Sequence, residues 1–333
     1  MKIKINTSIG KYDIVVLKHG LSSIPRLFNL ERKVLVITDS NIPTSLINKV
    51  LSYCKDGHLY ILKAGEKSKN INNYRKIMEY LVDNNFTRTD CIVALGGGVV
   101  GDIACFVAST FNRGIDFYNI PTSLLAMVDA SIGGKSAIDF KGIKNVIGAF
   151  YQPSCVLISL DTLKSLPKRQ LYNGLCESIK MAATFDASLF SLIENNNLDD
   201  ILQEVIIRSI KIKKEVIEKD TKEKGIRKVL NFGHTIGHGI EILAHGKLYH
   251  GEAIANGMLY MSSKEVSNRL SNLLDKYNIP HFYEIDKNKL YELLIHDKKA
   301  TDEYVDAILC EEIGSYKIIR IKIKELVDNY VKF

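Results

Sequence analysis

Five short apolar runs in the first half of the chain limit its possible folds more than any other feature. Each is rich in β-branched or aromatic residues and ends at or near Gly, Pro or Asp: KVLVITD (33–39), HLYILK (58–63), CIVALGG (91–97), IDFYNIP (115–121) and CVLISL (155–160). Continuous runs of this length are typical of strands buried on both faces. Between two of them, residues 73–85 carry apolar side chains at helical spacing. This alternation predicts a parallel sheet covered by helices, as in α/β domains.

The second half of the chain has a different pattern. Apolar residues recur at helical spacing from KRQLYNGLCESIKMAATF (168–185) to NRLSNLLDKY (268–277) and beyond. Only YVDAILCEE (304–312) and SYKIIRIKI (315–323) predict strands, in a hairpin near the end. Because 333 residues are many for a single core, we predict two domains. These are an α/β domain over residues 1–163 and a mainly α-helical domain over residues 164–333.

The composition argues against membranes and nucleic acids as partners. No apolar run approaches the ~20 residues that span a bilayer, and the N-terminus lacks the apolar core of a signal peptide. The net charge of +7 is modest, and acids are interleaved with the lysines, unlike the basic stripe of a nucleic-acid site. The six cysteines are scattered without a CxxC pair, as in reduced cytosolic proteins. We expect a cytoplasmic protein whose substrate can be anionic.

The segment after the third apolar run predicts a Rossmann-like nucleotide site. Gly96, Gly98 and Gly101 stand in GxGxxG register between a strand and a helix. Such glycines let backbone N–H groups approach a pyrophosphate, although tight packing of strand on helix gives the same pattern. The usual ribose-binding acid is missing, because Asp116 begins the next run instead of ending it. Asp39, at the end of the first run, is the better candidate, which implies a nucleotide held in a non-standard way.

Residues 128–150 form a second glycine-rich segment. Its GGKS resembles the end of a phosphate-binding loop, but Asp129 stands where GxxxxGK[ST] requires glycine, which excludes that type of ATPase. Lys135, Lys144 and Asn145 in this loop could bind a phosphate or a carboxylate. They could equally be surface residues, and the sequence leaves both alternatives open.

Half of the eight histidines fall within residues 234–250 and predict a metal site: His234, His238, His245 and His250. Glu177 lies in an apolar helical stretch, where a lone carboxylate is costly to bury. Spacing alone favours the i,i+4 pair His234 and His238, with Glu177, as a His₂Glu zinc site, and His250 is the alternative third ligand. Glu177 and Lys180 could instead be a simple surface pair, and we expect His245 to be a hydrogen-bonded core residue.

Several longer stretches resemble those of the 3-dehydroquinate synthase family: GGGVVGD, VDASIGGKS, IKNVIGAFYQP, GLCESIK, LNFGHTIGHGIE and HGEAIANGM. The resemblance extends from about Asp39 to the DKK at 297–299, nearly the whole chain. It implies an enzyme of the shikimate pathway, a phosphate-eliminating carbon–oxygen lyase that depends on NAD and on zinc or cobalt. It also implies a homodimer in which the active site lies between an NAD-binding α/β domain and a helical domain.

The resemblance assigns roles to individual residues. Its metal ligands are Glu177, His234 and His250, so that His238 turns to the substrate. The other substrate contacts are Arg113, which reaches the phosphate from the neighbouring subunit, Asp129, Lys135, Lys144, Asn145, Lys180, Lys213, Arg227, Asn231 and one or both of Lys298 and Lys299. The NAD contacts are Asp39, Asn41, Glu66, Lys69, Gly98, Val99, Val100, Gly101, Asp102, Thr122, Ser123, Lys135, Lys144, Thr162, Leu163, Lys164 and Ser165.

The implied reaction converts 3-deoxy-D-arabino-heptulosonate 7-phosphate to 3-dehydroquinate and phosphate. NAD transiently oxidises a hydroxyl group, the metal acts as a Lewis acid, phosphate leaves by elimination, the hydride returns, and an intramolecular aldol step closes the ring. The carboxylate and phosphate of this substrate account for the lysines and arginines. Departures from the family pattern, at Ser123, Cys176, Ser178 and Gly239, replace no predicted metal ligand or charged contact.

Three alternatives compete with this function. A related sugar-phosphate cyclase of secondary metabolism would act on a neutral sugar phosphate, and Arg227 with Asn231 argues against it. A metal-dependent polyol dehydrogenase would accumulate NADH. A non-enzymatic NAD-binding module would leave the joint presence of the glutamate, the histidines and the lysines unexplained.

Overall fold

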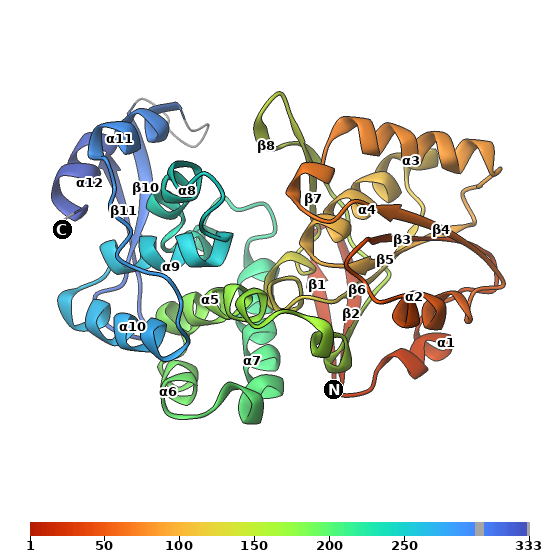
Figure 1. The fold of residues 1–333 in the computed structure, drawn as a ribbon, viewed down its shortest axis with the longest axis horizontal. Coiled ribbons are helices and arrows are strands. Elements are labelled where there is room, and N and C mark those ends of the chain that lie inside the picture. The colour runs from red at the N-terminus through yellow and green to blue at the C-terminus, as the bar shows by residue number, and fades with distance from the viewer. Residues whose placement is uncertain (297–302, 332–333) are drawn as a thin grey trace. The chain divides into compact units, whose positions relative to one another are not determined.

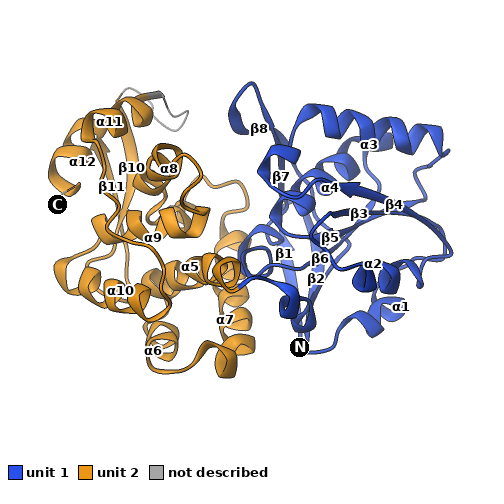
Figure 2. Cartoon of the chain, in the orientation of Figure 1, with its two compact units in different colours: residues 1–167 blue, residues 168–333 orange. Residues whose placement is uncertain are grey.

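The computed structural model describes residues 1–296 and 303–331, so Lys298 and Lys299 lie outside the described residues. The chain divides into two compact units, Met1–Pro167 and Lys168–Phe333 (Figure 2). The boundary predicted after residue 163 falls inside the short helix η5, Leu160–Ser165. No helix among the described residues is both long and apolar enough to cross a membrane.

Unit 1 is built on a seven-stranded sheet with the strand order β1-β2-β9-β6-β5-β3-β4 (Figure 1). The five predicted runs form β3 (Lys33–Asp39), β4 (Asp56–Leu62), β5 (Cys91–Gly96), β6 (Asp116–Pro121) and β9 (Cys155–Ser159), which pair in parallel. The prediction of a parallel α/β sheet is therefore confirmed, but the predicted burial of the second run is wrong, because β4 is an edge strand in which only Leu62 is buried. The N-terminal residues add an antiparallel hairpin of β1 (Lys2–Thr7) and β2 (Gly10–Leu17).

Helices cover both faces of this sheet: α1 (Ile24–Leu27), α2 (Thr44–Leu51), α3 (Ile71–Asp83) and α4 (Gly98–Thr110). Val34 and Val36 of β3 pack in one core with α1 and α2, whereas Leu35 and Ile37 pack in the other core with α3 and α4. The chain places β4 on one side of β3 and later places β5, β6 and β9 on the other. In α/β sheets, ligands bind at the carboxyl ends of the strands beside such a switch in strand order.

Residues 135–150, predicted as part of a loop, instead form the hairpin β7 (Lys135–Phe140) and β8 (Ile143–Phe150). Phe140 pairs with Ile143, so the turn consists of Lys141 and Gly142, whose φ angles are 49° and 80°. Two central residues with positive φ form a type I′ turn, which suits the twist of a two-residue hairpin. The glycine-rich composition led to the prediction of a loop, although one strand lies on each side of this Lys-Gly pair.

Unit 2 is mainly helical, as predicted: α5 (Lys168–Phe185), α6 (Ala187–Asn195), α7 (Leu198–Lys219), α8 (His234–Leu243), α9 (His250–Tyr260), α10 (Lys264–Lys276), α11 (Lys287–His296) and α12 (Ile323–Tyr330). The predicted hairpin near the end is also present, as the antiparallel strands β10 (Tyr304–Leu309) and β11 (Lys317–Lys322). Asp186 begins α6 by accepting a hydrogen bond from the Leu189 backbone N–H at 3.0 Å, an N-cap that satisfies one end of the helix.

Helices α8 and α9 meet backbone to backbone. A Cβ atom on Gly257 of α9 would lie 1.9 Å from the carbonyl oxygen of Gly233, which precedes α8 with a left-handed φ of 76°. Glycine meets both demands, because it has no side chain and adopts positive φ without strain. This close approach allows the first residues of the two helices, His234 and His250, to stand with their ring centroids 5.5 Å apart.

Candidate active site and metal centre

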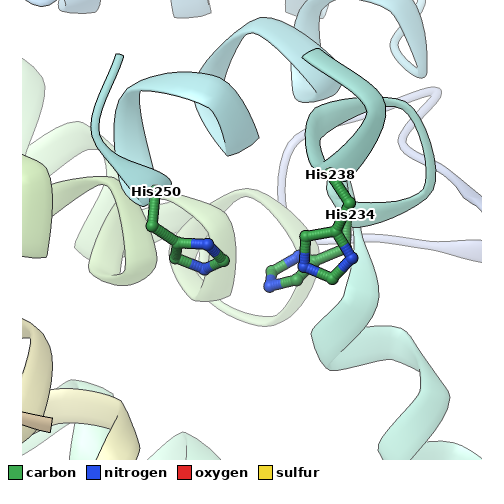
Figure 3. A group of neighbouring side chains, drawn as sticks. All are labelled: His234, His238 and His250. Carbon is green, nitrogen blue, oxygen red and sulfur yellow. The ribbon is translucent and has the colours of Figure 1, made fainter. Parts of the chain in front are cut away.

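Three histidines of unit 2 face one another: His234 and His238 from α8, and His250 from the start of α9 (Figure 3). One nitrogen from each ring lies within 4.8 Å of the other two. His234 and His238 share a face of α8 because they are one helical turn apart, whereas His250 reaches them through the turn between the two helices. The cluster is therefore close enough to share one metal ion.

His245 lies in the turn after α8, and its predicted place in the core is wrong. Its side chain is exposed, and its backbone has a φ of 47° directly after Ala244, where α8 ends. Left-handed residues commonly terminate helices, and Gly246 follows here with a φ of 84°. The apolar residues before His245 complete the last turn of α8 and carry no information about His245 itself.

Glu177 of α5 lies against this histidine cluster. Its side chain is only 1% exposed, and its Oε1 is 3.8 Å from Nε2 of His234 and 3.6 Å from Nε2 of His250. Its Oε2 is in ion-pair contact with the ammonium group of Lys180, one turn later. Within residues 1–296 and 303–331, Oε1 accepts no hydrogen bond of normal geometry. A buried carboxylate oxygen without a donor is costly, and a bound cation would remove that cost.

The electrostatics of the cluster give two of these groups the protonation state of a metal ligand. Burial alone would raise the pKa of Glu177, but the charges of Lys180 and His250 prevail and hold that pKa well below its usual range. Burial and the neighbouring cationic groups lower the pKa of His234 well below its ordinary value. For His250, burial is outweighed by Glu177 and Glu241, which raise its pKa to about 9. A metal ion at His250 would therefore displace a proton.

The orientation of two rings also fits a divalent cation. The Phe232 carbonyl oxygen lies 3.2 Å from Nδ1 of His234, and Glu241 Oε2 lies 3.0 Å from Nδ1 of His250. In each ring Nδ1 is thus engaged and Nε2 faces Glu177, the pattern of ligating histidines held by outer partners. One carboxylate oxygen and imidazole nitrogens form a donor set that Zn²⁺ accepts.

Among the described residues of unit 2, three cationic side chains are buried at 5% exposure or less: Lys180 on α5, Lys213 on α7 and Arg227 on η6 (Ile226–Asn231). A hydrogen bond of 3.0 Å from Ser209 to Ser178 joins α7 to α5 one turn before Lys213 and beside Glu177. Fully buried Lys and Arg side chains are rare, and the positive charge of these three suits an anionic ligand.

Most of the residues predicted to contact NAD lie along one edge of the sheet in unit 1, whereas Lys135 and Lys144 lie on the separate β7–β8 hairpin. Asp39 ends β3 and Asn41 follows it, residues 98–102 open α4 after β5, Thr122 and Ser123 follow β6, and residues 162–165 lie in η5 after β9. Because these strands are parallel, their carboxyl ends share one edge. The first two groups flank the switch in strand order between β3 and β5. The start of α4 adds backbone N–H groups that favour an anion.

Two more of the predicted NAD contacts, Glu66 and Lys69, form an ion-pair cluster with Asp102. Nζ of Lys69 lies 2.9 Å from Glu66 Oε1 and 3.1 Å from Asp102 Oδ2. Burial raises the pKa of Asp102 to about 6, against the opposing effect of Lys69. The structure thus connects the segment after β4 with Asp102, the fifth residue of α4.

Two family models cover most of the chain. The model of the 3-dehydroquinate synthase N-terminal domain matches residues 59–173, and that of the C-terminal domain matches residues 174–300. The chain belongs to the 3-dehydroquinate synthase family. A 3-dehydroquinate synthase from Acetivibrio thermocellus is 42% identical to it over 332 residues, which cover 93% of this chain and 92% of the relative.

Solved structures of two other synthases share the fold. The 2-deoxy-scyllo-inosose synthase solved with carbaglucose-6-phosphate, NAD⁺ and Co²⁺ superposes with a TM-score of 0.87 at 24% identity, over 98% of this chain and 100% of that one. The 2-epi-5-epi-valiolone synthase of Streptomyces hygroscopicus, solved with NAD⁺ and Zn²⁺, has a TM-score of 0.88 at 23% identity, over 99% and 98% of the two chains.

Of the remaining predicted substrate contacts of unit 1, Asp129, Asn145 and Arg113 lie on irregular backbone. Asp129 lies in a single π-helical turn, η4 (Ala126–Ala130), a type of turn that is frequent at functional sites. Lys135 begins β7, and Lys144 and Asn145 are exposed on β8, where Asn145 has a φ of 54°. Arg113 is exposed at the end of η3 (Phe111–Arg113) with a φ of 65°. Left-handed backbone at residues other than glycine is concentrated at functional positions in proteins.

Sequence reasoning gave no role to two residues that hold His250. Glu241 contacts its ring, and the Asn173 side chain accepts a hydrogen bond from the next backbone N–H, that of Gly251, at 2.6 Å. A signal for Glu241 was present, because it lies seven residues after His234 and three after His238, on the same face of α8. Asn173 offered no such signal, since α5 and α9 are far apart in the sequence.

Proposed function

We propose that this protein is a 3-dehydroquinate synthase that uses NAD and a divalent metal ion to convert 3-deoxy-D-arabino-heptulosonate 7-phosphate to 3-dehydroquinate and phosphate. The observation that carries the proposal is the buried carboxylate of Glu177, which faces Nε2 of both His234 and His250. Membership of the family supports the reaction, and the buried cations of unit 2 support an anionic substrate.

The proposed metal ligands are Glu177, His234 and His250, with His238 directed to the substrate. Three histidines are also close enough to be ligands, but the oxygen of Glu177 between two Nε2 atoms favours the mixed set. When bound, Zn²⁺ or Co²⁺ would supply a Lewis acid for hydroxyl groups of the substrate. The chain's part is to keep Glu177 ionised and His234 neutral, and to orient both rings.

The proposed NAD site is the edge of the sheet in unit 1, with Asp39 for a ribose hydroxyl and the start of α4 for the pyrophosphate. When bound, NAD would accept a hydride from the substrate and return it. Of the proposed substrate contacts, Arg227 is suited to a carboxylate, because its planar guanidinium can donate two parallel hydrogen bonds. Lys180 and Lys213 add fixed positive charge that does not need to reorganise during the reaction.

We further propose that the protein is a cytoplasmic homodimer. All six cysteines are free thiols, and five of them are buried, which suits a reducing compartment. Arg113 is exposed, so its guanidinium is accessible to a second copy of the chain.

One assay tests the proposed function. The purified protein is incubated with the heptulosonate phosphate, NAD⁺ and Zn²⁺ or Co²⁺, while phosphate and NADH are measured. The proposal requires phosphate release without net NADH. Stoichiometric NADH would indicate a dehydrogenase, and the absence of phosphate release would reject the cyclase.

A further inference from the structure

Glu241 completes a stripe of three polar side chains on one face of α8. It follows His234 and His238 at positions i+7 and i+3, which places all three on the same side of the helix. Its side chain is 18% exposed, and it lies 3.0 Å from His250, across the contact between α8 and α9. One helix therefore supplies a proposed metal ligand, a proposed substrate contact and a carboxylate that faces the next ligand.

The contact fixes which nitrogen of His250 can bind a metal. Oε2 of Glu241 lies 3.0 Å from Nδ1, and an ionised carboxylate can only accept a hydrogen bond. The hydrogen atom must therefore be on Nδ1 when the ring is neutral, which leaves the lone pair on Nε2. Nε2 is the atom that faces Oε1 of Glu177, at 3.6 Å. In the same way, the carbonyl oxygen of Phe232 accepts a hydrogen bond from Nδ1 of His234 and leaves the lone pair on Nε2.

The backbone of His250 is held by other groups. Glu252 accepts a hydrogen bond from the Tyr249 N–H at 2.8 Å in a capping box, and Arg169 holds Glu252 through two hydrogen bonds of 2.7 and 2.8 Å. Asn173 accepts the hydrogen bond from Gly251. Because these contacts fix the start of α9 without Glu241, the effect of Glu241 is confined to the imidazole ring.

We propose that Glu241 is a positioning residue that sets the tautomer and the orientation of His250 for metal binding. The inference rests on the proposed metal site of Glu177, His234 and His250. It assigns Glu241 an effect on metal affinity that is separate from any contact with the substrate.

The test compares Glu241→Ala and Glu241→Gln with the wild type and with Glu265→Gln, a change at an exposed glutamate of α10. The Zn²⁺ dissociation constant is measured by competition with a fluorescent chelator, and the visible spectrum of the Co²⁺ form reports the coordination geometry. We expect Glu241→Ala to weaken Zn²⁺ binding about 10- to 100-fold, as for other outer partners of ligating histidines, and to alter the Co²⁺ spectrum. The glutamine variant should be intermediate, because its amide oxygen still accepts the hydrogen bond.

The outcomes distinguish the positioning role of Glu241 from the proposed metal site on which that role depends. If the wild type binds Zn²⁺ and Glu241→Ala binds it equally well with an unchanged Co²⁺ spectrum, the positioning role is wrong and the metal site stands. If the wild type binds neither ion, the metal site itself is wrong, and the inference is overturned with it. Should the alanine variant not fold, the glutamine variant decides: weaker binding supports the role, and wild-type affinity overturns it.

Discussion

The histidines of the cluster differ in the groups that their ring nitrogens face. His234 has a carbonyl oxygen at Nδ1 and the Glu177 carboxylate at Nε2, which is the environment of a metal ligand. His238 follows one turn later, with its ring centroid 5.1 Å from that of His234. The i,i+4 spacing favours His234 and His238 as the two histidine ligands, whereas the family resemblance favours His234 with the more distant His250. Substitution of each histidine distinguishes the two sets.

We expect His250→Ala to lose bound Zn²⁺, whereas His238→Ala keeps it and loses activity. Removal of a direct ligand should cost more than the ~10- to 100-fold loss of affinity that is typical of outer partners. The measurement is the metal content of each purified variant after dialysis, together with phosphate release. Equal loss of metal from both variants would contradict the proposed ligand set.

The sequence predicted the members of this site but not their arrangement. Glu177 could be singled out because a carboxylate in an apolar stretch is unusual, and the histidines because they are clustered. The meeting of His234 with His250 depends on the path of the turn between α8 and α9 and on the glycine contact beneath it. Neither can be obtained from helical periodicity, and for that reason spacing alone preferred His238.

Among the elements, the buried strands were the most predictable, because a strand covered on both faces must be apolar at every position. The hairpin β7–β8 was missed for the converse reason, since β8 is largely exposed and lacks a continuous apolar run. The contact of α8 with α9 could not be predicted from apolar periodicity, because it depends on glycines that face the backbone of the other helix. Its sequence signal is only the frequency of glycine in LNFGHTIGHGIE and HGEAIANGM.

Gly257→Ala should separate α8 from α9. Its Cβ would lie 1.9 Å from the Gly233 carbonyl oxygen, and backbone cannot move aside cheaply. We expect a loss of about 3 kcal/mol in the free energy of unfolding, the upper part of the range for overpacked sites, and weaker Zn²⁺ binding. Urea unfolding followed by circular dichroism measures the first, and chelator competition measures the second.

Gly239→Ala in α8 is the matched control. Its Cβ would lie 2.2 Å from Cδ1 of Leu290, the end of a flexible side chain that can change its rotamer. The gain in helix propensity offsets this shift, so its stability should stay within about 1 kcal/mol of the wild type. Equal destabilisation by both substitutions would contradict the special role of the backbone contact.

The ion pair between α6 and α7 predicts how the stability of the fold depends on pH. Asp186 of the α6 N-cap also receives hydrogen bonds from Arg208 of α7, one of them at 2.6 Å. Burial would raise the pKa of Asp186, but these hydrogen bonds prevail and lower it from 3.8. A lowered folded-state pKa gives stability that is present above the ordinary pKa and lost as pH falls through the folded value. Asp186→Asn keeps the cap but removes the charge, so it should cost about 1 kcal/mol at pH 7.

That cost should shrink as the pH falls from the ordinary pKa of 3.8 through the lower folded-state pKa of Asp186, below which the wild-type carboxyl group is also neutral. Urea unfolding at neutral pH and at a pH below the folded-state pKa measures the difference. Asp328→Asn, at an exposed position of α12, is the control and should leave the free energy of unfolding unchanged at both pH values. A cost for Asp186→Asn that does not change with pH would show that the ion pair is not its source.

In the whole molecule, the two units contribute different parts of the proposed chemistry. The proposed NAD contacts belong to unit 1, and all three proposed metal ligands belong to unit 2. Neither unit holds the complete set, so the proposed reaction requires both. The family models also treat the two halves separately, since one match ends at residue 173 and the next begins at residue 174.

The proposed homodimer adds a residue from a second copy, and mixed dimers test it. Arg113→Ala and Glu177→Ala should each be inactive alone. If Arg113 serves the site of its partner, random reassociation of the two variants forms dimers with one complete site, and activity returns to about one quarter of the wild-type value. Glu177→Ala mixed with His250→Ala is the control and should stay inactive, because both changes damage the site of their own copy. Mixed dimers of the first pair that form but remain inactive would place Arg113 in the site of its own chain.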